Sequence, residues 1–421
     1  MATMSHAIPR VPIPWNGVDY RNKVVLAPMV RSGELPTRLL ALKYGADLVW
    51  GPETIDRALI GTTRKVNSET MTIDFTRVPS NGSRNPPPNQ RESLIYRIHP
   101  TREHKRLIFQ IGTSNASRAV EAARIVAADV AGIDVNAGCP KPFSTSGGMG
   151  AALLRTPDTL GGILEALVTE IGSEFGIGIS VKIRLLETPE MTEALVRRLC
   201  KTGITGLTVH CRTTPMRPRE RAIREQLQMI ASVCREHGVA CLMNGDVENR
   251  DQAVALMEQF GADGAMIATC AETNPSAFRA QADGGLLPWR EVVEEYMTTA
   301  LQVHNRWGNT KFLLGQLIPG KNQVYRKVVG CKSYVEACEA LGFPDLSDMA
   351  RDVDERLGIK ECSGSKAVGK ARSSNESAQA AAAAAAVAGA AVEKSVVSPR
   401  ADRTLLTTER SMEQRSVALS I

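Results

Sequence analysis

Several polar side chains stand where short apolar runs of this sequence end. They are Gln110, Asn136, Lys182, Arg184, His210 and Asn244. Apolar runs rich in β-branched residues are typical of buried strands, and the catalytic groups of parallel barrels lie at the carboxyl ends of their strands. Amides, a lysine and a histidine gathered at one mouth could bind the edge of a flat ring rich in hydrogen-bonding atoms.

Lys182 is the most informative of these residues, because it alternates with Val181 and Ile183 in an otherwise apolar run. A buried ammonium without a partner costs several kcal/mol, so an anionic partner is expected. The pyrimidine edge of a flavin is one such partner, since its reduced ring carries negative charge. An ion pair with a neighbouring carboxylate such as Asp134 is the alternative.

Two late turns predict a phosphate site. The seventh run ends in Asn244, Gly245 and Asp246, and the eighth leads through Ala268 and Thr269 toward a short helix. In barrels of parallel strands, the last two strand ends and a short helix often hold a phosphate through backbone N–H groups. A cofactor that carries a phosphate is therefore expected.

Eight apolar runs alternate with helical patterns along the first two thirds of the chain. This alternation indicates parallel strands joined by crossover helices, and eight units predict a closed (β/α)8 TIM barrel of the α/β class. The runs are 24–27, 48–50, 107–109, 132–135, 179–183, 206–209, 240–243 and 264–268.

The rest of the chain divides around this barrel. We expect an N-terminal extension over 1–20, the barrel over 21–287 and an insertion on its loop face over about 54–105, partly disordered around the polar segment 80–88. Helical patterns without strands predict a small all-helical domain over 288–360. Residues 361–421, dominated by Ser and Ala, are expected to be a disordered tail.

Composition narrows the class of protein. The chain has 421 residues, 43% of them hydrophobic, and a formal net charge of +6. Nine cysteines without a Cys-x-x-Cys pair argue against a disulfide framework and a zinc site, so a reducing compartment and no metal are expected. No apolar run is long enough to span a membrane and no secretory signal is present, which predicts the cytoplasm, and the nucleus as a second location.

Read together, these segments resemble the tRNA-dihydrouridine synthases from about Val24 to about Gly342. The Cys-Pro-Lys segment and the Ser-Thr-Ser-Gly-Gly-Met-Gly run look most like the eukaryotic type that acts at position 20 of the tRNA D-loop. The motifs are Leu26-Ala27-Pro28-Met29-Val30, Gln110, 133–141, 147–154, 181–184, 210–213 and Asn244-Gly245-Asp246. Ala137, Ser146 and Ala268-Thr269-Cys270 differ from the usual residues of the family.

This resemblance implies a flavin-dependent reduction of uridine to 5,6-dihydrouridine. NADPH would reduce FMN, the reduced FMN would pass hydride to C6 of uracil, and Cys139 would give the proton to C5. Pro28, Met29 and Val30 would line the flavin ring, and Gln110, Lys182 and His210 would hold its polar edge. The ribityl phosphate would lie against Asn244, Gly245, Asp246, Ala268 and Thr269.

Basic residues predict where RNA is held. The loop after the sixth run carries five arginines, and the stretch between Tyr296 and Val335 has six Lys or Arg and no Asp or Glu. A basic surface beside the mouth favours tRNA as the partner of an enzyme that we expect to be monomeric. The residues expected to contact the substrate are Asn136, Lys141, Arg184, Arg212, Lys321, Arg326 and Lys327.

Three other functions stay open at this point. A small-molecule FMN reductase of the dihydroorotate or enoate type shares the barrel and the flavin, but it needs neither the helical domain nor the arginine loop. A phosphate-binding lyase or isomerase would lack flavin. An RNA-binding protein without catalysis would bind RNA and oxidise no NADPH.

Overall fold

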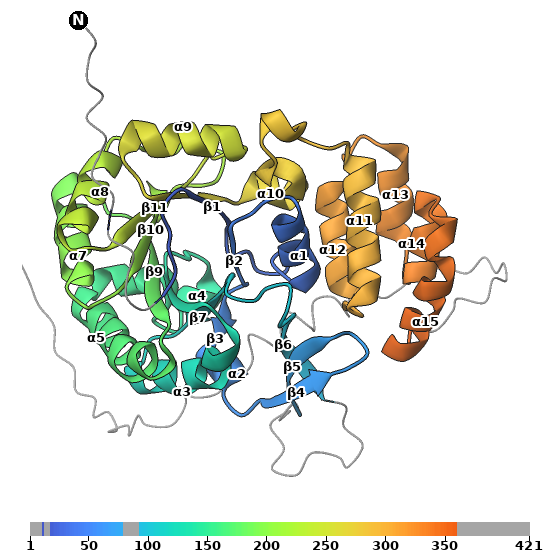
Figure 1. Ribbon diagram of the computed structural model, residues 1–421, viewed down its shortest axis with the longest axis horizontal. Helices are drawn as coiled ribbons and strands as arrows, with labels where there is room; N and C mark the ends of the chain where they lie inside the picture. Colours follow the sequence, from blue (N-terminus) through green and yellow to red (C-terminus); the bar gives the residue numbers. More distant parts are fainter. Residues whose placement is uncertain (1–10, 12–16, 79–91, 360–421) are drawn as a thin grey trace, which may run out of the picture. The chain divides into compact units, whose positions relative to one another are not determined.

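Eight parallel strands close into a barrel in the computed structural model, which describes residues 11, 17–78 and 92–359 (Figure 1). Neighbouring strands pair in the order β2-β1-β12-β11-β10-β9-β8-β7, and a pairing between β2 and β7 closes the circle. Each predicted run therefore forms a strand, and the predicted TIM barrel is confirmed. The strands are β1 (Lys23–Leu26), β2 (Leu48–Trp50), β7 (Leu107–Gly112), β8 (Gly132–Ala137), β9 (Gly178–Leu185), β10 (Gly206–Thr213), β11 (Ala240–Asn244) and β12 (Gly264–Ile267).

Helices connect the strands. Several begin at side chains that cap the first backbone N–H groups, as Thr188 does for Met191 and Asn249 for Gln252. The longer connecting helices are α1 (Leu35–Lys43), α3 (Ala116–Val126), α5 (Pro157–Leu167), α7 (Pro189–Cys200), α8 (Leu227–Glu236) and α9 (Arg250–Phe260). The shorter ones are η1 (Ala127–Asp129), α4 (Pro142–Thr145), η2 (Gly150–Arg155), η3 (Val168–Gly172), α6 (Ser173–Phe175), α10 (Thr269–Thr273), η4 (Pro275–Phe278) and η5 (Gln281–Asp283).

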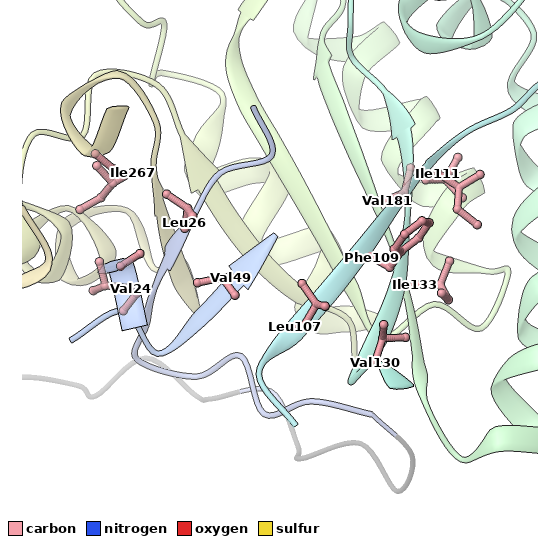
Figure 2. Close-up of a cluster of buried hydrophobic side chains, with 14 of the residues drawn as sticks. Val24, Leu26, Val49, Leu107, Phe109, Ile111, Val130, Ile133, Val181 and Ile267 are labelled. Atoms are coloured by element: carbon pink, nitrogen blue, oxygen red, sulfur yellow. The ribbon is translucent and has the colours of Figure 1, made fainter. Parts of the chain in front are cut away.

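Alternation along the strands separates two apolar cores. Side chains such as Val24, Leu26 and Ile133 belong to the core between the strands and the helices (Figure 2). Their neighbours Val25 and Ile108 belong to a second core that also contains Leu48, Trp50, Leu242 and Met266. Because successive side chains of a strand point to opposite faces, this second core fills the barrel interior. The polar residues of the mouth continue the same inward rows.

The insertion predicted over about 54–105 forms a small antiparallel sheet. After β3 (Thr54–Ile55) and α2 (Asp56–Leu59), the strands β4 (Thr63–Asn67), β5 (Thr72–Arg77) and β6 (Ser93–Ile98) pair in sequence order. The segment 80–88, predicted to be disordered, lies outside the described residues. The antiparallel pairing was not predicted.

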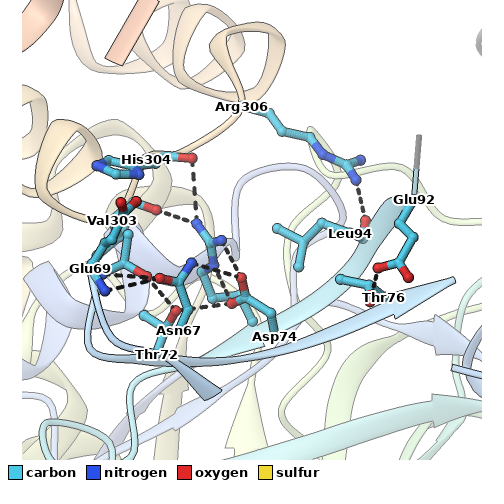
Figure 3. A network of polar contacts seen from close by, with 12 residues as sticks. Asn67, Glu69, Thr72, Asp74, Thr76, Glu92, Leu94, Val303, His304 and Arg306 are labelled. Atoms are coloured by element: carbon cyan, nitrogen blue, oxygen red, sulfur yellow. Dashed lines mark hydrogen bonds and ion pairs between the residues drawn. The ribbon is translucent and has the colours of Figure 1, made fainter. Parts of the chain in front are cut away.

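This sheet is bonded to the helical region (Figure 3). Arg97 of β6 donates to Asp74 of β5 at 2.6 Å and also to the backbone oxygen of Val303, between α11 and α12. Arg356 near the end of the helical region donates to Glu69 at 2.8 Å. The insertion therefore braces the helices that follow the barrel.

The helical region follows Pro288, as predicted. Its helices pack against one another, and α11 and α12 also contact α1 and α10 of the barrel. They are α11 (Trp289–Gln302), α12 (Trp307–Leu317), α13 (Gln323–Gly330), α14 (Tyr334–Leu341) and α15 (Ser347–Leu357), with η6 (Pro344–Leu346) before the last. The predicted tail and most of the N-terminal extension lie outside the described residues.

Candidate active site

A cavity of about 290 Å³ opens at the carboxyl ends of the barrel strands. Ligand sites commonly have volumes of roughly 300 to 1,000 Å³, so this cavity is at the small end of that range. It is lined by Pro28, Met29, Val30, Gln110, Asn136, Cys139, Lys141, Lys182, Arg184 and His210, all predicted from the sequence, and by Glu53, Gly138, Pro140, Phe143 and Glu272. The structure thus brings most of the predicted site residues to one place.

A chain of amide contacts fixes the loop that carries Cys139. Gln110 donates to the buried carboxylate of Asp134 at 2.7 Å, and Asn136 donates to Gln110 at 3.3 Å. The side-chain oxygen of Asn136 accepts from the backbone N–H groups of Gly138 and Cys139, both at 3.0 Å. Asn136 therefore positions the thiol as well as lining the cavity.

Lys182 does not form the ion pair with Asp134 that the sequence left open. Its ammonium donates to Asn244 at 3.0 Å, while Asp134 accepts from Gln110 and Ser180. Burial, and to a smaller extent the charge of the nearby Arg184, lower the pKa of Lys182 to about 8. A partly buried cation that donates to one amide is well suited to an anionic or electron-rich ligand.

His210 is neutral in this site. Burial and the charges of Lys182, Arg184 and Arg212 lower its pKa to about 2. Nε2 of His210 lies 3.1 Å from the Arg212 guanidinium, which can only donate. Nε2 is therefore the acceptor and Nδ1 carries the hydrogen, so the ring has one donor left for a ligand.

The hydrogen bonds of Arg212 are made to other groups of the protein. Its buried guanidinium forms an ion pair with Asp246 and donates to the backbone oxygens of Glu220 and Pro218. Arg212 does not line the cavity, and these bonds argue for a supporting role in place of the substrate contact expected from the sequence. The Asp246 carboxylate is likewise occupied, which leaves backbone N–H groups for the predicted phosphate.

The turn after β11 is held tightly from one side. Arg224 donates to the backbone oxygens of Gly245 and Asp246 at 2.9 and 2.8 Å. Gly245 has a φ of +119°, and a Cβ there would lie 3.2 Å from Ala222 and 3.4 Å from His210. Glycine is thus required by backbone conformation and by space. Ala268 and Thr269 follow β12 at the start of α10, outside the cavity lining.

The Cys139 thiol is half-buried at the cavity wall. Burial raises its pKa, Glu53 raises it further, and contacts with Lys141 and Ser144 act in the opposite direction. The thiol is therefore protonated at neutral pH and can act as an acid. Cys200, Cys234 and Cys241 are buried in apolar surroundings, as the sequence predicted.

Sequence reasoning missed two acidic residues of the cavity. Glu53 follows β2 by three residues, and Glu272 lies on α10 after β12, where it accepts a hydrogen bond from Ser32. Asking which polar residue follows the second run would have found Glu53. No sequence pattern of this kind indicated Glu272, because it lies on a helix and not at the end of an apolar run.

The predicted basic residues divide into anchored and free groups. Arg306 and Lys311 donate to the backbone oxygens of Leu94 and Cys331. Seven others have exposed side chains that form no hydrogen bond or ion pair with residues 17–78 and 92–359. They are Lys321, Arg326, Lys327, Lys332, Arg217, Arg219 and Arg221. The second group is available for a polyanion.

The helical region lies next to the mouth. Arg31, which directly follows the cavity residue Val30, stacks on the Phe312 ring of α12 with 4.1 Å between the guanidinium carbon and the ring centroid. Helix α10, which follows β12 and carries the cavity residue Glu272, also contacts α12. A polyanion bound to the helices could therefore also reach the cavity.

The described residues contain neither a membrane-spanning helix nor a metal cluster. No helix in that part of the chain is long and apolar enough to cross a membrane. No group of three His, Cys, Asp or Glu side chains there is arranged to hold a metal ion.

A parallel barrel whose polar mouth contains a buried lysine, a neutral histidine and a protonated thiol defines a ligand-binding site of the kind found in barrel enzymes. The family model described as dihydrouridine synthase matches residues 25–313. The chain belongs to this family, which confirms the resemblance seen in its motifs.

Curated relatives of this chain have names that specify a tRNA position. It is 51% identical to the tRNA-dihydrouridine(20) synthase of Schizosaccharomyces pombe over 72% of this chain and 61% of that protein. It is 46% identical to the synthase of the same name from Saccharomyces cerevisiae, over 75% of this chain and 82% of that protein. A tRNA-dihydrouridine(20a/20b) synthase of Saccharomyces cerevisiae is 25% identical over 75% of this chain.

Proposed function

We propose that this protein reduces uridine to 5,6-dihydrouridine in the D-loop of tRNA, at position 20, with FMN as cofactor and NADPH as reductant. The observation that carries the proposal is the Cys139 thiol, which lies in one cavity with Lys182, His210 and the amides of Gln110 and Asn136. The names of two curated relatives, 51% and 46% identical to this chain, specify the same tRNA position.

The donor set of the cavity fits FMN. Lys182 offers a cation, His210 a ring N–H and Gln110 an amide to the polar edge of a flavin, while Pro28, Met29 and Val30 form an adjoining wall. Asn244 orients Lys182, and the backbone of Gly245, Asp246, Ala268 and Thr269 would hold the phosphate. When bound and reduced, FMN supplies the hydride.

The residues of this chain then supply the proton. Hydride addition at C6 of uracil leaves negative charge that a proton at C5 must neutralise. Cys139 is held at the cavity by the bonds of Asn136 to its backbone, and its thiol is protonated at neutral pH. Arg184 donates to the backbone oxygen of Gly138 at 2.8 Å, so it braces the same loop while lining the cavity.

Access to the base requires that the nucleotide leaves its stack, which costs a few kcal/mol. Exposed Lys141 at the rim and the free side chains of Lys321, Arg326 and Lys327 would offset part of this cost by binding phosphates. A small substrate has no use for such a surface, which disfavours the dihydroorotate or enoate alternative.

Purified protein should make dihydrouridine at position 20 of an unmodified D-loop transcript when NADPH is supplied, with FMN released on denaturation. Dihydrouridine is mapped by primer extension after alkaline ring opening. Product at another position would correct the specificity, whereas protein free of flavin and without product would overturn the proposal. Dihydroorotate and enoates serve as competing substrates in the same assay.

A further inference from the structure

Glu53 places a carboxyl group inside the cavity wall. Its Oε1 accepts a hydrogen bond from the Ser144 hydroxyl at 3.2 Å. Its Oε2 is buried without a hydrogen-bond partner among the described residues. Burial raises the pKa of Glu53 to about 7, although Ser144 and Lys141 act in the opposite direction. A carboxyl group in this position is partly protonated at neutral pH and has no role in the mechanism above.

Ser144 connects this carboxyl group to the thiol. The serine is fully buried in α4, directly after the loop of Cys139. A Cβ on Gly150 would lie 2.4 Å from Oγ of Ser144 and 2.6 Å from the backbone oxygen of Cys139, so both atoms crowd the same glycine. Ser144 also acts against the rise in the pKa of Cys139 that burial causes. The hydroxyl thus contacts the Glu53 carboxyl group and lies beside the backbone of Cys139.

We propose that Glu53 and Ser144 return a proton to Cys139 after each reduction. This inference rests on the proposed function, in which Cys139 gives its proton to C5 of uracil and becomes a thiolate. For this transfer the Ser144 hydroxyl turns from Glu53 to sulfur and gives sulfur its proton, while the protonated Glu53 carboxyl group gives its own proton to the Ser144 oxygen. The Glu53 carboxylate takes a proton from solvent at the open mouth, which restores all three groups.

The direction of transfer is favourable. A thiolate whose pKa is raised by burial is a stronger base than the Glu53 carboxylate, so the proton moves toward sulfur. Glu53 delivers a proton only in its protonated form. Repeated turnover should therefore slow as the pH rises through about 7, where Glu53 ionises.

The test separates the first turnover from later ones. Glu53→Gln enzyme, reduced in advance and mixed with excess tRNA and NADPH, should form the first equivalent of dihydrouridine at the parent rate. Later turnovers should slow by about 100-fold or more, the low end of what acid-base groups contribute. After the first turnover Cys139 should remain a thiolate, detected as faster alkylation by iodoacetamide. The parent's loss of steady-state rate above pH 7 should be absent from this variant.

Two further variants keep the test decisive. Ser144→Ala should reproduce the slow later turnovers, and it carries the test if Glu53→Gln protein loses flavin. Cys139→Ala should fail already in the first turnover. Parent rates in the steady state for the Glu53 and Ser144 variants would overturn the relay, whereas normal product from Cys139→Ala would overturn the proposed function.

Discussion

The basic side chains at the barrel mouth and those of the helical region are held in opposite ways. Lys182 and Arg184 on β9 and Arg212 on β10 are hydrogen-bonded to neighbouring groups. Lys321, Arg326 and Lys327 are exposed on and before α13. Lys182 and Arg184 line the cavity in fixed positions and can orient a ligand there, and Arg212 supports them, whereas the second group can only contribute charge. The barrel mouth thus orients a ligand, whereas the helical region contributes affinity for a polyanion.

The difference has an energetic consequence. Buried groups are poorly screened, so changes at the mouth should act at any salt concentration. Exposed charges bind phosphates largely through release of counterions, which makes their contribution dependent on salt. The predictions below test this division, beginning with the largest expected effect.

Cys139→Ala should abolish dihydrouridine formation, a loss of about 100-fold or more, because the proton donor is removed. Flavin content and NADPH oxidation should equal those of the parent, since Cys139 is not among the groups that hold the flavin edge. Quantification of dihydrouridine by mass spectrometry, alongside stopped-flow flavin reduction, separates the two steps. Product at the parent rate would show that another group is the acid.

Lys182→Met should weaken FMN binding by about 10- to 100-fold, corresponding to the 1.5 to 3 kcal/mol of a hydrogen bond to a charged group. Methionine retains most of the side-chain volume, so the barrel should remain folded. Titration of the apoprotein with FMN at low and high salt gives the affinity. An affinity loss that disappears at high salt would contradict the division between the two regions.

Charge reversal in the helical region should affect tRNA and leave the flavin alone. In the variant with Lys321, Arg326 and Lys327 replaced by Glu, tRNA affinity should fall and its dependence on log salt should flatten by about 2 to 3, or 0.7 to 0.9 per lost contact. In a matched control, Glu replaces the exposed Lys105, Arg106 and Lys201. These residues precede β7 and β10, at the end of the barrel opposite the cavity. Equal effects in both variants would indicate a response to net charge alone.

The last prediction concerns folding, with no ligand bound. The pKa of Glu53 is raised from 4.5 to about 7, so the folded protein disfavours its charged form. The protonated form stabilises the fold fully below pH 4.5, and this stability is lost as the pH rises through 7. Glu53→Gln should therefore gain up to roughly 3 kcal/mol over the parent at pH 8 and little at pH 4.5. Urea unfolding at both pH values measures the difference, and Lys321→Gln should show none.

Local sequence patterns were sufficient to predict the barrel and most of the residues at its mouth. Each apolar run became a strand, because burial on both faces selects β-branched residues over a short span. Because functional groups lie at strand ends, the sequence predicted that four residues share one site. These residues, Gln110, Asn136, Lys182 and His210, line one cavity. The motifs around Cys139 were enough to recognise the family.

The remaining features depend on partners far apart in the chain. Arg212 meets Asp246 across 34 positions, and Lys311 is occupied by Cys331, so neither charge could be assigned from its own segment. The insertion needed its contacts with Val303 and Arg356 before it could be understood as a brace. Sequence alone determined which residues form strands and end them, because these preferences are local. Only tertiary structure decided which polar groups remain free for a ligand, because that depends on which distant groups are brought into hydrogen-bonding distance.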